Sequence, residues 1–175
     1  MELRRNAAVE GAGQVGDPPL VMGILNLTPD SFSDGGRCQS PEQALAQARR
    51  LLAQGADVLD LGGQSTRPGA EMVGAAEELR RVLPALQAVG TLRERWPAMR
   101  ISIDTFEAAV AERALAAGAD WINDVRGANA SVEAPGGTLR DPAMLPLIAR
   151  SGCPRSEEHT SELQSPCNLV CRLLL

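Results

Sequence analysis

Short apolar runs alternate with helix-forming segments along this chain, and this alternation limits its fold more than any other feature. The apolar runs are residues 21–25, 57–61, 101–104 and 121–125, and a polar loop follows each of them. Strands and helices in strict alternation predict a parallel sheet with right-handed crossovers.

The first helical segment carries clear boundary signals. Ser40 is an N-cap residue, Pro41 suits the first helical position, and Gln43 completes a capping box. Gly55 is placed to end this helix. Three further helices are expected: residues 74–95, a third that Thr105 caps and that runs to Gly118, and a fourth from Asp141 and Pro142 to about Gly152.

Two parallel architectures fit this order of elements. A doubly wound sheet usually carries a Gly-rich fingerprint after its first strand, and none is present here. A barrel concentrates polar residues at the carboxyl ends of its strands, and Asn26, Gly62, Asp104 and Asn123 each close an apolar run. We therefore predict an α/β fold of the TIM (β/α)8-barrel family.

Only the first half of such a barrel is expected in this chain. A complete barrel takes about 250 residues, and this sequence has 175 residues with four strand-helix units. Four units alone would leave the first and fourth strands as unpaired edges and would expose an apolar inner face.

Composition excludes several classes of partner. The net charge is −5, and the chain has two Phe, two Trp and no Tyr. Few aromatic side chains and an acidic balance argue against nucleic acid and anionic membranes as partners. The four cysteines fit no zinc or redox spacing. The N-terminus lacks the apolar stretch of a signal peptide, so we expect a cytoplasmic protein with no membrane span.

The polar residues at the strand ends have both structural and functional interpretations. Taken singly, Asn26 could cap a turn, Asp104 could cap a helix, and Asn123 could be a turn former. A polar residue at every strand end favours a site instead, because buried polar groups are unfavourable unless they are paired or used. The loop at 62–69 combines hydroxyls with Arg67, which suits phosphate binding.

Two long motifs resemble the signatures of a known family. Residues 22–36, MGILNLTPDSFSDGG, resemble the first signature of the dihydropteroate synthases, and residues 60–70, DLGGQSTRPGA, resemble the second. Residues 102–105 and 122–125 match the family's third and fourth strand ends. The resemblance covers about residues 20–154.

The resemblance implies a synthase that joins 6-hydroxymethyl-7,8-dihydropterin diphosphate to 4-aminobenzoate in folate biosynthesis. Loss of diphosphate, which Mg²⁺ helps to bind, leaves a pterin methyl cation that the aniline nitrogen attacks. The resemblance assigns roles as follows: Asn26 to the metal; Asp104 and Asn123 to the pterin ring; Asp34, Thr66 and Arg67 to catalysis; and Phe32, Thr66, Arg67 and Pro68 to the 4-aminobenzoate pocket, where sulfonamides compete.

The sequence departs from the family pattern in two ways. Gln64 stands where Glu is common, and we expect little consequence from this change. The family's later strands supply a second pterin-binding Asp, a Lys, and an Arg/His pair, and these have no counterpart here. The resemblance therefore implies a chain that is inactive alone, from a parent enzyme that is a homodimer.

The C-terminal residues differ from the rest of the chain. Residues 155–165 show no strand character and resemble a translated sequencing adapter. We therefore expect three segments: a flexible stretch at 1–19, the N-terminal half of a pterin-binding barrel at 20–154, and a non-native tail at 155–175.

Two other functions remain as alternatives. The first is a non-catalytic pterin-binding module, related to the methyltetrahydrofolate-binding barrel of corrinoid-dependent methyltransferases. That group lacks loops like those at residues 32–34 and 65–68, so their presence favours the synthase. The second is a structural protein built on a decayed half barrel, in which the polar strand ends would have drifted.

Overall fold

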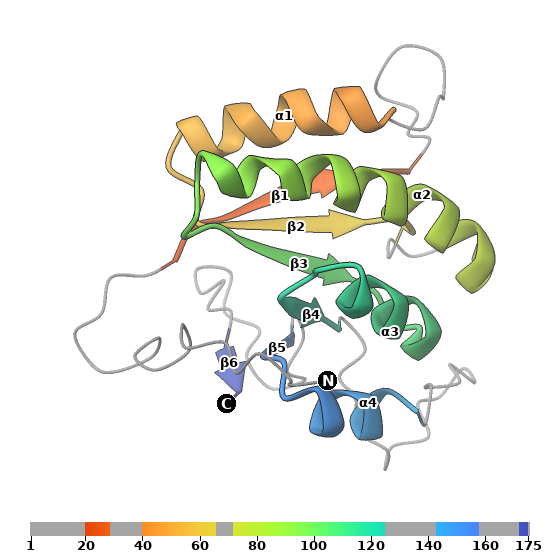
Figure 1. The fold of residues 1–175 in the computed structure, drawn as a ribbon. Helices are drawn as coiled ribbons and strands as arrows, with labels where there is room; N and C mark the ends of the chain where they lie inside the picture. Colours follow the sequence, from red (N-terminus) through yellow and green to blue (C-terminus); the bar gives the residue numbers. More distant parts are fainter. Residues whose placement is uncertain (1–19, 29–39, 66–71, 125–142, 158–171, 175) are drawn as a thin grey trace, which may run out of the picture.

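A parallel sheet forms the centre of the molecule. The structure, a computed structural model, describes residues 20–28, 40–65, 72–124, 143–157 and 172–174. The strands lie in chain order, and β1 to β5 are parallel while β6 runs antiparallel to β5 (Figure 1). Their bounds are β1 Met22–Asn26, β2 Val58–Gly62, β3 Arg100–Asp104, β4 Trp121–Asn123, β5 Arg155–Glu157 and β6 Arg172–Leu174.

The helices follow the strands and pack on one another in the same order. They are α1 Pro41–Ala53, α2 Gly74–Gly90, the 3-10 turn η1 Thr91–Glu94, α3 Ala108–Ala116 and α4 Met144–Ser151. Figure 1 shows α1 and α2 side by side on one side of β1, β2 and β3. A strand order without reversal is that of a barrel wall rather than of a doubly wound sheet. The predicted half barrel is confirmed.

One face of the sheet is apolar and packs against the helices. Its buried strand residues share one core with helix residues such as Ala48, Val82 and Leu86. Alternate residues of a strand point to opposite faces, so one side-chain set faces the helices throughout. That set consists of Leu25, Leu59, Leu61, Ile101, Ile103 and Ile122, all with no exposed surface.

The opposite face is largely polar, which corrects the expectation of an apolar inner face. Asp60 is level with Ser102 across β2 and β3, and Asp104 is level with Asn123 across β3 and β4. Ile24, on β1, is 60% exposed on this face. The expectation was wrong because, apart from Ile24, the leucines and isoleucines of β1 to β4 point to the helices.

Two aspartates, Asp57 and Asp120, make equivalent hydrogen bonds between neighbouring segments at the amino-terminal end of the sheet. The carboxylate of Asp57 accepts the backbone N–H of Val21, and that of Asp120 accepts the N–H of Ile101, both at 2.8 Å. Each aspartate follows a glycine with positive φ, Gly55 at 100° and Gly118 at 106°. The sequence Gly-Ala-Asp, at residues 55–57 and again at 118–120, therefore has a structural role at the start of β2 and of β4.

The observed helix boundaries confirm some of the predicted caps and ends. Ser40 caps α1 with both hydrogen bonds of a capping box to Gln43. Thr105 does not cap α3, because its hydroxyl accepts the N–H of Glu107 at 3.1 Å and α3 begins after that residue. The helix predicted at 74–95 ends earlier, since the chain tightens into η1. Asp141 and Pro142 lie outside the described residues, whereas Gly152 does end α4, with a φ of 63°.

The chain after α4 adds two short strands. β5 pairs with β4, which corrects the expectation that residues 155–157 lack strand character and that β4 is an edge. The backbone groups of an uncovered strand can pair with a following segment whatever its side chains are. Residues 158–165 lie outside the described part of the chain.

Among the helices of the described residues, none has the length and hydropathy needed to cross a bilayer.

Candidate functional site at the carboxyl ends of the strands

The structure brings three of the predicted site residues to one row at the carboxyl edge of the sheet. Asn26 is level with Gly62, Gly62 with Asp104, and Asp104 with Asn123. Residues that are level in paired strands point to the same face of a sheet, so the side chains of Asn26, Asp104 and Asn123 lie on one face. This arrangement is the one predicted for Asn26, Asp104 and Asn123.

Gly62 makes room for two oxygen atoms in this row. A Cβ on Gly62 would lie 3.4 Å from Asp104 Oδ2 and 3.9 Å from Asn26 Oδ1. Since Gly62 has no side chain, the amide oxygen from β1 and the carboxylate from β3 can both approach the space above β2. A larger residue at position 62 would fill the space between them.

Asn123 is hydrogen-bonded to Asp60, which lies one row nearer the amino-terminal end of the sheet. Its Nδ2 donates to Asp60 Oδ2 at 3.0 Å, and both side chains are buried. Sequence reasoning did not single out Asp60 as a site residue. The available signal was a carboxylate in the middle of an otherwise apolar strand, because such groups are rarely buried unless paired.

The oxygen pair of Asn26 and Asp104 fits the chemistry of a Mg²⁺ site. Mg²⁺ prefers oxygen ligands, keeps several waters, and is often bound by one or two carboxylates together with substrate phosphates. In the ranges that the structure describes, no group of three His, Cys, Asp or Glu side chains could hold a metal ion. The row can therefore supply part of a metal site, with the remaining ligands coming from water and substrate.

The other predicted site residues are not among the described ones. Phe32, Asp34, Thr66, Arg67 and Pro68 lie outside the described ranges. Their assigned roles in catalysis and in 4-aminobenzoate binding stay predictions.

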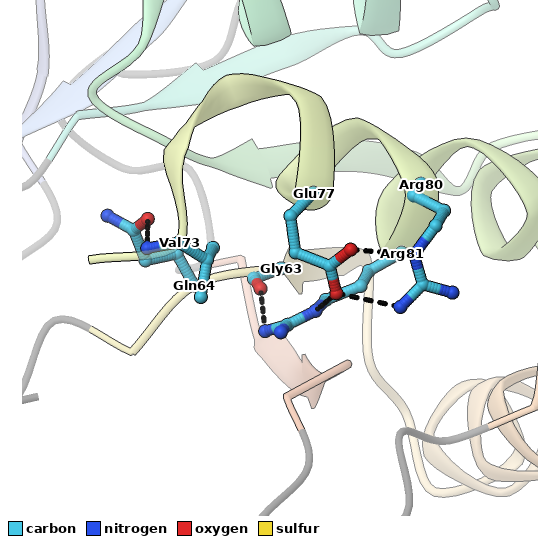
Figure 2. A network of polar contacts seen from close by, with 6 residues as sticks. All are labelled: Gly63, Gln64, Val73, Glu77, Arg80 and Arg81. Atoms are coloured by element: carbon cyan, nitrogen blue, oxygen red, sulfur yellow. Dashed lines mark hydrogen bonds and ion pairs between the residues drawn. The ribbon is translucent and has the colours of Figure 1, made fainter. Parts of the chain in front are cut away.

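The two ends of the second loop are joined by the side chain of Gln64 (Figure 2). Its Oε1 accepts the N–H of Val73 at 3.1 Å, and its Nε2 donates to Met72 Sδ at 3.7 Å. Gln64 is 5% exposed, whereas Met72 is 55% exposed, so only the Gln64 side of these contacts is buried. A carboxylate at position 64 could accept the first hydrogen bond but could not donate the second.

A second polar network fixes Gly63, the residue before Gln64. Arg81 of α2 donates to the Gly63 carbonyl at 3.0 Å and is itself held by Glu77 at 2.7 Å (Figure 2). Glu77 also pairs with Arg80. The Arg80 and Arg81 guanidinium groups lower the pKa of Glu77 to about 2. The base of the second loop is therefore bonded to α2.

A buried carboxyl group, Glu78, lies directly behind this loop base. Only 1% of Glu78 is exposed, and its Cγ lies 3.0 Å from where a Cβ on Gly63 would be. Burial raises the pKa of Glu78 to about 7; the Thr105 hydroxyl and the Arg81 guanidinium oppose this shift, and the Glu107 carboxylate adds to it. Sequence reasoning missed Glu78, although it falls at helical spacing with Val82 and Leu86 on the buried stripe of α2.

Comparison with protein families and curated proteins gives consistent matches. The family described as pterin binding enzyme matches residues 22–165. The chain is 45% identical over 147 residues to the dihydropteroate synthase of Synechocystis, covering 84% of this chain and 50% of that protein. It is 44% identical over 135 residues to the Bacillus subtilis dihydropteroate synthase, covering 77% and 42%.

Solved structures agree with these matches. The dihydropteroate synthase of Xanthomonas albilineans with 4-aminobenzoic acid superposes with a TM-score of 0.65 at 45% identity, covering 79% of this chain and 46% of that one. Its complex with 7,8-dihydropteroate gives a TM-score of 0.59 at 41% identity. This chain therefore spans about half, or less, of the length of these relatives.

Proposed function

Because the chain belongs to the pterin binding enzyme family, we propose that it is the N-terminal half of a dihydropteroate synthase and supplies part of its pterin site. The observation that carries this proposal is the row of Asn26, Gly62, Asp104 and Asn123 at one sheet edge. The relatives described above are synthases, which favours this function over the methyltetrahydrofolate-binding alternative.

The side chains of Asp104 and Asn123 in this row suit a pterin ring. The aminopyrimidinone edge of a pterin offers N–H donors beside nitrogen and carbonyl acceptors. The Asp104 carboxylate can accept from such N–H groups, and the Asn123 amide can both donate and accept. Because Asn123 and its neighbour Asp60 are shielded from water, hydrogen bonds made there are stronger than at the surface.

The reaction that we propose for the whole enzyme is a substitution at the pterin methylene carbon. The bond between that carbon and the diphosphate oxygen breaks, and the diphosphate leaves with the electron pair. The aniline nitrogen of 4-aminobenzoate then forms a bond to the carbon and loses a proton. Mg²⁺, when bound, neutralises charge on the leaving diphosphate.

We assign the residues of this chain to parts of that reaction. We propose that Asn26, whose amide oxygen borders the space above Gly62, would bind Mg²⁺ at the diphosphate end of the site. We propose that Asp34 stabilises the cation electrostatically, that Thr66 and Arg67 assist it, and that Phe32 and Pro68 complete the 4-aminobenzoate pocket. Sulfonamides would compete there. We further propose a cytoplasmic location and a homodimeric parent enzyme.

Direct binding to this chain tests the proposal. Titration with 6-hydroxymethyl-7,8-dihydropterin diphosphate and Mg²⁺ should show saturable binding by calorimetry, and Asp104→Asn and Asn123→Leu should each weaken it about tenfold or more. Ser151→Ala, in an exposed position on α4, is the matched control and should bind normally. Equal affinity for methyltetrahydrofolate, or no effect of either site substitution, would overturn the proposal.

A further inference from the structure

The hydrogen bond between Asp60 and Asn123 joins two strands that are not neighbours. Asp60 lies on β2 and Asn123 on β4, with β3 between them (Figure 1). The register places Asp60 level with Ser102, and Asn123 one row further toward the carboxyl edge, level with Asp104. The bond therefore runs diagonally across β3, past the positions of Ser102 and Asp104.

The surroundings of this bond are closed to water. Asp60 is 4% exposed, Asn123 is 6% exposed, and Ser102 is fully buried. The Ser102 hydroxyl has no hydrogen-bond partner among the residues that the structure describes. Ser102 is therefore a small side chain beside the Asp60–Asn123 hydrogen bond, and its hydroxyl does not bond to either residue.

The hydrogen bond to Asp60 determines whether the NH₂ end or the oxygen end of the Asn123 amide faces Asp60. A side-chain amide has a donor end and an acceptor end of nearly the same shape, so shape alone does not choose between them. A carboxylate only accepts, so Asp60 selects the NH₂ end at 3.0 Å. The amide oxygen is then directed away from Asp60.

We propose that Asp60 is a positioning residue, which fixes the orientation of the Asn123 amide so that its oxygen is presented to an N–H group of the pterin ring. This inference rests on the proposed pterin site and adds a residue that acts through Asn123 rather than by touching the ligand. The interaction holds the amide before the ligand arrives, so binding does not have to order it.

Three substitutions in this chain separate positioning from simple packing. Asp60→Leu keeps the bulk of the side chain in a leucine-rich strand but removes the acceptor. Asp60→Asn keeps an acceptor oxygen at nearly the same place. Ser102→Ala, on the neighbouring strand, is the matched control, because it changes a buried hydroxyl without touching the bond.

Two readouts are needed, and one of them requires no ligand. Exchange of the Asn123 side-chain NH₂ with solvent, measured by NMR, should be at least about tenfold faster in Asp60→Leu and unchanged in Ser102→Ala. Affinity for 6-hydroxymethyl-7,8-dihydropterin diphosphate should fall about tenfold or more in Asp60→Leu. Asp60→Asn should recover most of that loss.

The outcomes distinguish this inference from the proposed function. Unchanged Asn123 exchange and unchanged affinity in folded Asp60→Leu would overturn the positioning role, as would failure of Asp60→Asn to recover affinity. Fast exchange in Asp60→Leu, together with no saturable pterin binding by the unsubstituted chain, would support the positioning role and overturn the proposed function instead.

Discussion

Replacing Glu78 by Gln should remove a large part of the pH dependence of this chain's stability. Glu78 is 1% exposed, and burial raises its pKa from 4.5 to about 7 in the folded chain. In the unfolded chain the carboxyl group returns to its ordinary value. Between those two pH values the folded chain binds one more proton than the unfolded chain, so the free energy of unfolding falls as pH rises.

The magnitude follows from the width of that window. One proton contributes about 1.4 kcal/mol per pH unit, so Glu78 lowers the free energy of unfolding by about 3 kcal/mol between pH 4.5 and 7. The stabilisation is fully present below pH 4.5 and is lost once pH has risen through 7. Gln has nearly the size of a protonated Glu and does not titrate, so Glu78→Gln should lack this loss.

Urea unfolding at pH 5, 6, 7 and 8, followed by tryptophan fluorescence, measures the effect. At pH 5 we expect the variant and the unsubstituted chain to unfold at similar urea concentrations. At pH 8 the variant should be more stable by up to about 3 kcal/mol. Glu112→Gln, at an exposed position on α3, is the control and should keep the original slope. Parallel pH profiles for Glu78→Gln and the unsubstituted chain would refute the reasoning.

Three further predictions concern single positions. Gly62→Ala should weaken pterin binding about tenfold, because the added Cβ enters the space that the Asn26 and Asp104 oxygens border; normal affinity by calorimetry would contradict this. Asp120→Ala should lower the free energy of unfolding by about 1–3 kcal/mol, because the N–H of Ile101 loses its acceptor; no change in urea midpoint would count against it. Ser40→Ala should cost about 1 kcal/mol through loss of the α1 cap, measured the same way; an unshifted midpoint would show that the cap contributes nothing.

Local chemistry explains why much of the fold could be predicted from the sequence. The cap of α1 depends on residues three apart, Ser40 and Gln43, so the sequence contains the whole interaction. The strand ends could be predicted because Asn26, Asp104 and Asn123 each interrupt an apolar run. Parallel strands in chain order then bring these residues to one edge without further information.

The features that sequence reasoning missed depend on tertiary neighbours. The Asp60–Asn123 bond joins residues 63 apart on strands that do not pair with each other. Glu78 lies on the buried stripe of α2, next to Gly63, whereas its residue type alone predicts an exposed position. β5 forms because β4 has backbone groups to pair with, which does not depend on strand propensity.

The separation of the two sheet faces has a consequence for how the protein tolerates change. Along β2 and β3, residues that face the helices alternate with residues that face the site. In a scan of all substitutions, positions 59, 61, 101 and 103 should fail through loss of folded protein, so lower temperature or a stabilising background would rescue them. Positions 60, 62 and 104 should instead yield folded protein with altered ligand binding, which no stabilising background would repair. Ligand specificity can therefore change through the strand residues that face the site, while selection for folding acts on the alternate residues that face the helices.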